Sequence, residues 1–433
     1  MDFQFFHELL SIDSTSGKER KVAEWLVERL PELFPASNRP VLRVDEVGDG
    51  TLNLLLTWGE PRIVFCSHLD TVPPFIPPTF CDRWPVKPAM TESNTPGLTA
   101  SVFPGACSPV IPGLLRNLPD VIAGRGSCDA KGQVFAMVEA CKRLAEEGST
   151  DFGLLLLAGE ETGSWGAKAF AKTGFKAEYL VVGEPTDNCM VSASKGTKSF
   201  DLKFSGVPFH SGYPQYGVSA VDLFVTFVNA LKAKDFGMDP VLGETTWNIG
   251  LVHSDNPQNI LSPELTCRLY FRTTFISDEA VTQWMAEAPD MMREEGWRTE
   301  TPDVLREDMW MAETPDVLRE GRSQPAMTES TVPGQTPSVI PGRSSSVIPG
   351  LTGNLAVTAR GGDMPARYWT VPDLPAKTVA FGSDAPHLTG FTHKAICGPG
   401  SITVAHRDDE HVRVADLAVA VEQYLALYRA ATK

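Results

Sequence analysis

The sequence lacks the features of secreted, membrane-spanning and nucleic-acid-binding chains. Its eight cysteines are scattered and include no C-x-x-C pair, so we expect reduced thiols and no disulfide framework. No run of about 18 apolar residues is present that would span a bilayer. The first residues show no basic stretch followed by an apolar core and a cleavage site. These absences predict a cytoplasmic protein.

Positive charge is also scarce. The chain has 38 Lys and Arg against 54 Asp and Glu, which gives a net charge of −16. Nucleic acids and anionic membranes are bound by clustered positive charge, so neither is an expected partner. A hydrophobic fraction of 42% in 433 residues indicates a folded protein, and this length favours two or three domains.

Short apolar runs alternate with amphipathic segments in the first part of the chain. Residues 52–57 and 179–182 are typical of buried strands, since they are apolar and bounded by turn-forming or charged residues. Residues 17–34 and 131–145 carry apolar side chains at helical spacing. Strands that alternate with helices predict an α/β fold with a layered sheet.

The pattern changes near residue 192. Residues 199–206 and 264–273 alternate polar and apolar side chains and flank a helical segment at 219–234, which predicts a smaller antiparallel α+β domain. The α/β pattern resumes near residue 377 and closes with a helix over 414–430. We therefore predict an α/β domain in two parts with the smaller domain inserted between them, at 1–191, 192–298 and 367–433.

Two stretches fit neither pattern and resemble each other. PAMTESNTPGLTASVFPG at 88–105 matches PAMTESTVPGQTPSVIPG at 325–342. Two isolated copies rich in Pro, Gly, Ser and Thr cannot stack into a solenoid core. We interpret them as in-frame insertions of one repeated element, at about 85–119 and 299–366, that form loops or disorder.

His68 and Asp70 form the first candidate motif, directly after an apolar run at 62–67. A histidine can ligate a metal while a nearby carboxylate fixes the tautomer and orientation of its imidazole. Taken alone, a loop histidine with a capping aspartate is the simpler interpretation.

Asp129 lies in the second motif, the glycine-punctuated turn GRGSCDAKG. The turn lacks the third glycine of a dinucleotide loop and the Gly-Lys-Ser/Thr of a phosphate loop, so phosphate binding is not expected. By itself Asp129 is most simply a helix N-cap. A thiol mechanism through Cys128 is discounted because no paired histidine is indicated.

The third motif is Glu160-Glu161, which follows a run of four leucines. Burying like charges together is costly unless a cation or a proton compensates them, although placement at a surface strand end explains the pair equally well. Glu184 again follows an apolar run, and His406 lies in the C-terminal segment CGPGSITVAHRDDE.

The conjunction of these motifs is more informative than any one of them. Open α/β sheets place their sites at the carboxyl ends of strands, where most of these residues are predicted. Two histidines and several carboxylates are the ligand chemistry of zinc or another divalent metal, and a bridging carboxylate can hold two ions.

The order and spacing of the motifs resemble metallopeptidase family M20 over nearly the whole chain except the two repeated stretches. The resemblance implies an α/β fold, with a mixed-sheet zinc-hydrolase catalytic domain and an inserted smaller α+β, ferredoxin-like domain that acts as lid and dimerisation domain. It also implies a homodimer and two divalent metal ions, most simply Zn²⁺ with Co²⁺ able to substitute. The ligands implied are His68, Asp129, Glu161, Glu184 and His406.

The same resemblance implies further roles. Glu160 matches the general base and Asp70 the aspartate that orients His68. In the inserted domain, His210 matches a histidine that reaches into the partner subunit's site to steady an oxyanion. Substrate binding is implied for Asn259 and Arg272, although a hairpin turn and a solvated strand residue are the plainer interpretations of these two. Ser383 and Asp384 resemble a late pair of the family, and we assign them no role.

The function implied is hydrolysis of an amide bond by metal-activated water. Segments such as HLDTVPPFIPP and GRGSCDAKG are similar to the acetylornithine deacetylase and succinyl-diaminopimelate desuccinylase branch. Our first hypothesis is therefore an N-acyl amino acid deacetylase, with acetylornithine as substrate and a role in arginine biosynthesis. A metallo-dipeptidase or carboxypeptidase is the alternative. An inactive binding protein is disfavoured because Glu160 and the five ligand positions are all present.

Overall fold

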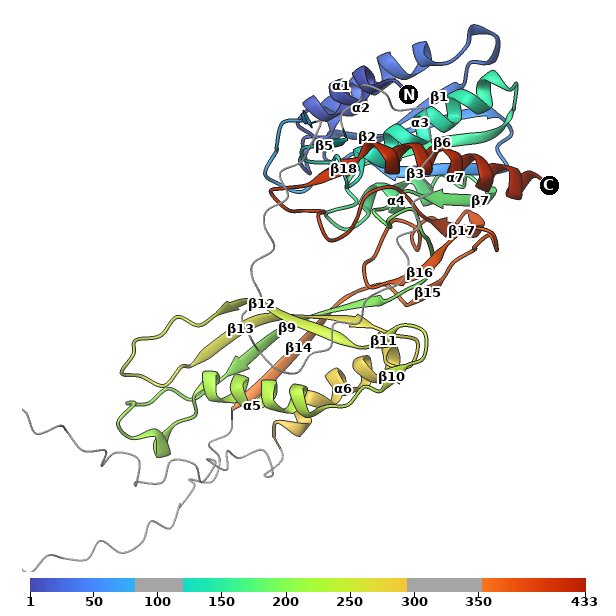
Figure 1. Ribbon diagram of the computed structural model, residues 1–433. Coiled ribbons are helices and arrows are strands. Elements are labelled where there is room, and N and C mark those ends of the chain that lie inside the picture. Colours follow the sequence, from blue (N-terminus) through green and yellow to red (C-terminus); the bar gives the residue numbers. More distant parts are fainter. Residues whose placement is uncertain (82–119, 294–352) are drawn as a thin grey trace, which may run out of the picture.

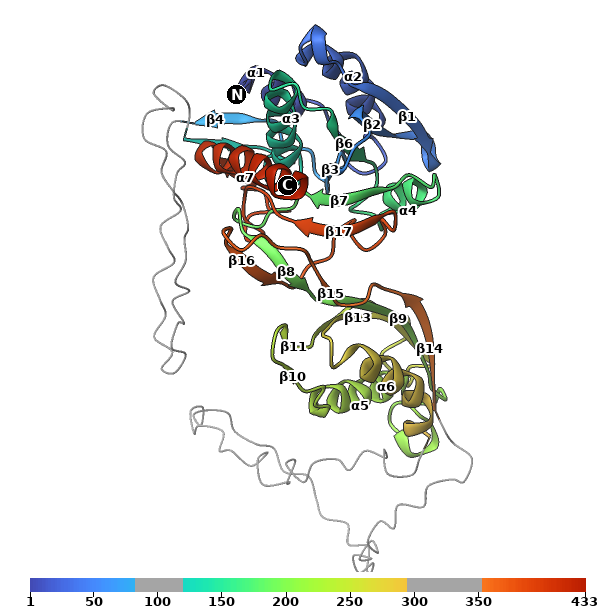
Figure 2. The same cartoon turned by 90° about the vertical axis from the view of Figure 1, so that its right-hand side faces the viewer.

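The computed structural model describes residues 1–81, 120–293 and 353–433, which form a larger and a smaller domain (Figures 1 and 2). The larger domain contains both ends of the chain. The predicted first insertion at about 85–119 lies outside the described residues, as does the greater part of the second.

A six-stranded mixed sheet forms the centre of the larger domain. Its strand order is β1-β2-β6-β3-β7-β17. Strands β6, β3, β7 and β17 run parallel to one another, whereas β2 is antiparallel to both of its neighbours. The strands are β1 (Val41–Val47), β2 (Thr51–Gly59), β3 (Ile63–His68), β6 (Asp151–Leu157), β7 (Ala177–Val182) and β17 (Phe391–Ile396).

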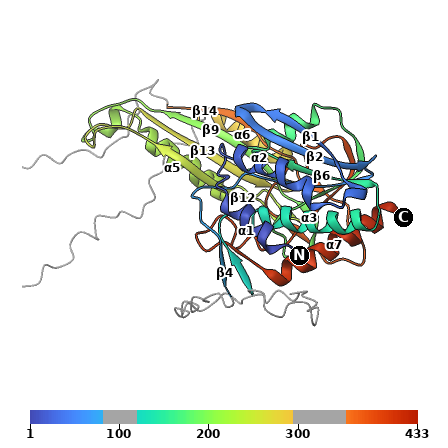
Figure 3. The ribbon, with the colours of Figure 1, turned by 90° about the horizontal axis from the view of Figure 1, so that it is seen from above.

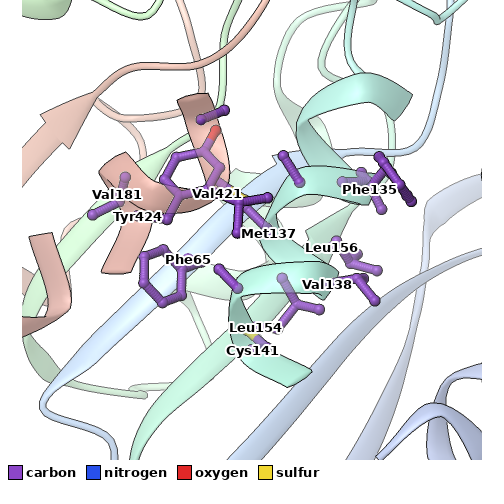
Figure 4. Close-up of a cluster of buried hydrophobic side chains, with 14 of the residues drawn as sticks. Phe65, Phe135, Met137, Val138, Cys141, Leu154, Leu156, Val181, Val421 and Tyr424 are labelled. Carbon is purple, nitrogen blue, oxygen red and sulfur yellow. The ribbon is translucent and has the colours of Figure 1, made fainter. Parts of the chain in front are cut away.

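Helices cover both faces of this sheet, which explains why β3 is buried at every position. One face is covered by α1 (Phe3–Ser11), α2 (Arg20–Arg29), α3 (Lys131–Glu146) and α7 (Val414–Thr432), and the other by α4 (Trp165–Ala171). Phe65 and Leu154 of the sheet lie in one core with Met137 and Tyr424 of the helices (Figure 4). Helices α3 and α7 lie side by side over it (Figure 3). In the described part of the chain, no helix has the length and apolar character needed to cross a bilayer.

Two small sheets complete the larger domain. In one, β5 (Val121–Ala123) lies between β4 (Thr79–Cys81) and β18 (His411–Arg413). In the other, β8 (Met190–Ser194) lies between β15 (Ala366–Arg367) and β16 (Ala376–Val379). Short 3₁₀ turns occur at Leu30–Leu33, Ala36–Asn38, Gly48–Gly50 and, in the smaller domain, Pro214–Tyr216.

The smaller domain is an antiparallel sheet of order β12-β13-β9-β14 packed against two helices. Along the chain its elements are β9 (Gly196–Ser205), α5 (Ala220–Ala233), β12 (Thr246–His253), β13 (Glu264–Thr273), α6 (Asp278–Met291) and β14 (Asn354–Gly361). A two-residue ladder of β10 (Met238–Asp239) and β11 (Gly243–Glu244) precedes β12. This β-α-β-β-α-β order agrees with the ferredoxin-like arrangement expected from the sequence.

The predicted end of the second insertion, at residue 366, is wrong. Strand β14 pairs with β9 along the edge of the smaller sheet, and β15 pairs with β8 in the larger domain. The β-α-β-β-α-β fold needs a fourth strand after α6, so the smaller domain continues past the predicted boundary at 298. The short alternating run NLAVTARG was hidden by the repeat-rich composition that precedes it.

Candidate metal centre

Three parallel strands bring four of the predicted site residues to one edge of the main sheet. His68 is the last residue of β3, Glu160 and Glu161 follow β6, and Glu184 follows β7. Because the carboxyl ends of parallel strands meet at the same edge, these residues come from neighbouring positions in the fold, as the sequence predicts.

Asp129 and His406 reach the same place from loops. Asp129 lies between β5 and the start of α3, and His406 lies beyond the end of β17 with a positive φ of 64°. The Asp129 Oδ1 atom is 3.1 Å from His68 Nε2, and its Oδ2 atom is 3.3 Å from His406 Nε2. His406 Nε2 is also 2.9 Å from Glu161 Oε1. Each oxygen of Asp129 therefore faces a different histidine.

The donor atoms of this cluster suit a divalent cation. One ligand atom each from His68, Asp129 and Glu161 lies within 4.8 Å of the others. The Oε1 atom of Glu184 is buried and has no hydrogen-bond partner among the described residues. Imidazole nitrogens and carboxylate oxygens are the ligands of zinc and related metals, and a cation would offset the buried negative charge. The residues present thus fit a metal centre.

Asp70 contacts the segments that carry His68, Glu160 and Glu161. Its carboxylate accepts hydrogen bonds from the backbone N–H groups of Glu160 and Glu161, at 3.0 and 3.1 Å, and from the Ser16 hydroxyl at 3.0 Å. His68 Nδ1 is 2.9 Å from the main-chain oxygen of Asp70 and 3.5 Å from its carboxylate. An Nδ1–H that donates to this carbonyl leaves Nε2 with the lone pair a metal needs.

The pKa values of the site reflect burial and close contact. Burial, helped by the charges of Asp384 and Glu161, raises the pKa of Glu160 well above its ordinary value. Hydrogen bonds to Asp129 and Glu161 raise the pKa of His406 to about 10. Burial works against ionisation of Asp129, but its bonds to His406 and His68 outweigh it and lower the pKa of this carboxyl. A partly buried glutamate with a raised pKa suits a general base.

The predicted residues of the smaller domain lie apart from this cluster. His210 and Asn259 are neighbours, because the backbone N–H group of Ser211, the residue after His210, donates to the Asn259 carbonyl at 2.9 Å. The Nδ1 atom of His210 accepts a hydrogen bond from the Gly212 N–H group at 3.1 Å. Arg272 lies over the Tyr270 ring, with 5.0 Å between its guanidinium carbon and the ring centroid. Within the described ranges, no hydrogen bond or ion pair joins His210, Asn259 or Arg272 to the metal cluster.

Sequence reasoning missed three contributors to the site. Ser16 reads as a helix cap, yet α2 begins only at Arg20 and the hydroxyl binds Asp70 instead. Glu410 and Arg125 form a buried ion pair of 2.6 Å beside Asp129. No local pattern indicates that pair, because its members are 285 positions apart in the chain.

Asp384 is also part of the surroundings of the site. Its side chain is buried, its Oδ1 atom has no partner among the described residues, and burial raises the pKa of its carboxyl to about 6. It therefore adds to the unbalanced negative charge that a cation would offset.

A mixed α/β sheet with histidines and carboxylates gathered at the carboxyl ends of its parallel strands is the arrangement of a metal-dependent hydrolase. Residues 115–430 match the sequence profile of peptidase family M20/M25/M40. The chain belongs to this family.

Relatives of known sequence span almost all of the chain. A probable carboxypeptidase from Aspergillus oryzae is 27% identical over 457 aligned positions, which cover 99% of this chain and 86% of that protein. A probable carboxypeptidase from Emericella nidulans is 30% identical over 465 positions, covering 98% of this chain and 88% of that protein.

Solved structures share the fold. A tripeptidase from Staphylococcus aureus superposes with a TM-score of 0.66 at 17% identity, covering 99% of this chain and 97% of that one. An M20 family metallo-carboxypeptidase from Sulfolobus solfataricus gives a TM-score of 0.58 at 14% identity, covering 99% of both chains. The mixed α/β fold predicted from the sequence is confirmed.

Proposed function

We propose that the protein is a metal-dependent peptidase that removes an amino acid from a short peptide, as a carboxypeptidase or dipeptidase does. The observation that carries the proposal is the position of Asp129, whose two oxygens face His68 and His406 near the partly buried Glu160. A carboxylate placed between two histidines suits a bridge between two metal sites.

The chain offers ligands for two ions. His68, Glu184 and Asp129 would hold one, and Glu161, His406 and Asp129 the other, with Zn²⁺ the metal that this donor set suits best. When bound, such ions polarise the scissile carbonyl and lower the pKa of water.

The protein's own residues supply the proton transfers. Glu160 takes a proton from the attacking water and later gives it to the leaving amine, for which its raised pKa is well matched. Arg272 binds the free carboxylate at the end of the peptide. Asn259, the neighbour of His210, contacts the peptide from the same subunit as His210. His210, contributed by a partner subunit, steadies the negative charge that develops on the carbonyl oxygen when water attacks.

The names of similar proteins favour a peptide over an N-acyl amino acid as the substrate. Two relatives that align with nearly the whole chain are called probable carboxypeptidases, and a protein of the same fold is called a tripeptidase. The deacetylase expected first from the sequence uses the same residues on a different acyl group, and acetylornithine is therefore the competing substrate in the test.

A homodimer through the smaller domain completes the proposal. Strand β12 is an edge strand that pairs only with β13 among the described strands. Its residues Leu251 and Val252 are 70% and 53% exposed. An apolar, unpaired edge is a template for pairing with a second chain. In a dimer paired at this edge, we expect His210 of one subunit to reach the metal site of the other.

Release of free amine from a panel of substrates tests the proposed function. The panel contains dipeptides, tripeptides, the same dipeptides with an amidated C-terminus, and N-acetyl amino acids that include acetylornithine. Metal-dependent release from peptides with a free carboxylate, with the amidated forms poor substrates, is the expected result. Preference for acetylornithine would restore the deacetylase hypothesis, and metal binding without any turnover would favour a binding protein.

A further inference from the structure

Glu410 holds the loop that carries Asp129. Its Oε1 atom accepts three backbone hydrogen bonds from this loop, from the N–H groups of Gly126 at 2.8 Å, Cys128 at 3.1 Å and Asp129 at 3.1 Å. Successive backbone N–H groups that converge on one oxygen form a nest that fixes the path of the chain. The Glu410 carboxylate thus occupies the anion-binding site that the backbone N–H groups of this loop form.

Arg125 binds the second carboxylate oxygen of Glu410. Its Nη1 atom donates to Glu410 Oε2 at 2.6 Å and to the Arg407 carbonyl at 3.1 Å, while its Nε atom donates to the Pro74 carbonyl at 3.1 Å. Both charged side chains are almost completely buried, with 1% and 0% of their surfaces exposed. The charge of each is balanced by the other, so neither is left unpaired in the interior.

The pair connects three of the segments that carry the proposed ligands, those of His68, Asp129 and His406. Pro74 lies on the connection that leaves His68, and Arg407 directly follows His406. Asp129 is held through its own N–H group. A shift of the pair would therefore change the positions of the two histidines relative to the carboxylate between them.

The loop needs such support because its sequence does not fix its shape. Gly124 and Gly126 adopt positive φ angles of 138° and 83°, which most other residues avoid, and glycine is free to leave such conformations. Both Asp129 oxygens must nevertheless remain within reach of their histidines. Sites that depend on such geometry lose much of their activity when a supporting group is displaced by about 1 Å.

We propose that Glu410, backed by Arg125, is a positioning residue that aims the two oxygens of Asp129 at the two metal positions. The inference rests on the proposed function in that Asp129 bridges the metals. It assigns Glu410 no contact with substrate and no proton transfer.

Glu410→Gln is the variant that tests this role. The amide oxygen can still accept from the loop, but the amide nitrogen then faces the Arg125 guanidinium and the balancing charge is lost. We expect Co²⁺ to bind about 10- to 100-fold more weakly, the usual cost of losing a group that orients a ligand. We also expect an altered visible spectrum of the Co²⁺ protein and a kcat that falls with little change in KM.

The metal-free protein gives an independent measurement. Amide hydrogen exchange at Gly126, Cys128 and Asp129 should be slow in the unaltered protein and much faster in Glu410→Gln. Glu139→Gln is the matched control. Glu139 is another buried glutamate; it lies on α3 and forms ion pairs with Lys142 and with the N-terminal ammonium group. This variant should leave the exchange of this loop, the Co²⁺ affinity and the spectrum unchanged.

The possible outcomes are distinct. A Glu410→Gln protein that is less stable to heat yet keeps the Co²⁺ affinity, the spectrum and the slow exchange would overturn the proposal and leave a merely structural ion pair. If this variant does not fold, Arg125→Lys retains a charge opposite Glu410 but loses the fork to Pro74 and Arg407. An altered Co²⁺ spectrum in Arg125→Lys supports the proposal, and an unaltered one overturns it. Failure to hydrolyse peptides in the unaltered protein would refute the proposed function without affecting these comparisons.

Discussion

Asp129 differs from the other carboxylates of the site in what it faces. Each of its oxygens lies near a histidine, whereas Glu160 contacts Asp70 through its backbone N–H group, and its side chain makes no hydrogen bond or ion pair among the described residues. This difference supports the proposal that Asp129 is a metal ligand and Glu160 a general base. Residue types and strand ends in the sequence predicted both positions, but the roles of Ser16, Arg125 and Glu410 depend on contacts between distant segments that no local pattern records.

Glu160→Ala should separate metal binding from chemistry. Loss of a general base typically costs about 10²- to 10⁴-fold in rate, so kcat should fall by that amount. The bound metal, measured by elemental analysis after dialysis, should be unchanged because Glu160 is proposed as the base and not as a ligand. Glu178→Gln, at an exposed glutamate paired with Arg62, should change neither quantity. A Glu160→Ala protein that loses its metal would show that Glu160 is itself a ligand.

Asp13 should give the N-terminal loop a stability that depends on pH. Partial burial opposes ionisation, but hydrogen bonds from Thr15 and the charge of Lys18 lower the pKa of Asp13 to about 2. A carboxyl whose folded pKa is depressed stabilises the fold above its unfolded pKa, 3.8, and loses that effect as pH falls through about 2. Urea unfolding should therefore show Asp13→Ala less stable at pH 6, with the difference narrowing below about pH 4. A difference that stays constant down to about pH 3 would contradict this.

At the scale of the element, hydrophobic patterning predicted most of the helices but fewer than half of the strands in the described residues. Residues 131–145 and 264–273 were expected as a helix and a strand, and α3 and β13 occupy these positions. The boundary near β14 could not be predicted in this way. A strand of eight residues gains its identity from pairing with β9, which lies far away in the sequence.

The repeated stretch between β4 and β5 should be dispensable. The two strands pair directly, with Cys81 opposite Val121, so the ends of the described chain are already side by side. Replacing residues 82–120 with Asn-Gly, a favoured two-residue hairpin turn, should leave the melting temperature unchanged and kcat/KM within about twofold of the unaltered protein's value. Loss of folding or turnover would show that these residues, which lie between Asp70 and Asp129 in the sequence, contribute to the fold or to the metal site.

At the scale of the whole molecule, the smaller domain presents an apolar edge on β12, and His210, the residue proposed to steady the oxyanion, lies in this domain apart from the metal site. Among the described residues of one chain, no hydrogen bond or ion pair joins His210 to the metal cluster. The proposed assembly of two chains through the exposed edge of β12 would account for both features.

Leu251→Glu should disrupt this assembly by placing charge on the edge of β12. Light scattering after gel filtration should then report the mass of one chain instead of two, and peptide turnover should fall with it. Met364→Glu is the control, since Met364 is equally exposed, at 71% against 70%, but lies outside β12. A Leu251→Glu protein with unchanged mass would place the dimer contact elsewhere or show that the chain acts as a monomer.

The central claim is that a metal pair centred on Asp129 hydrolyses peptides. The most direct measurement is a titration of the metal-free protein with Zn²⁺, in which bound metal and hydrolysis of a dipeptide are followed together. We predict no turnover without metal and turnover that reaches its maximum as the second equivalent binds. Hydrolysis that persists after complete removal of metal, or tight binding of two equivalents with no hydrolysis of any peptide, would contradict the account.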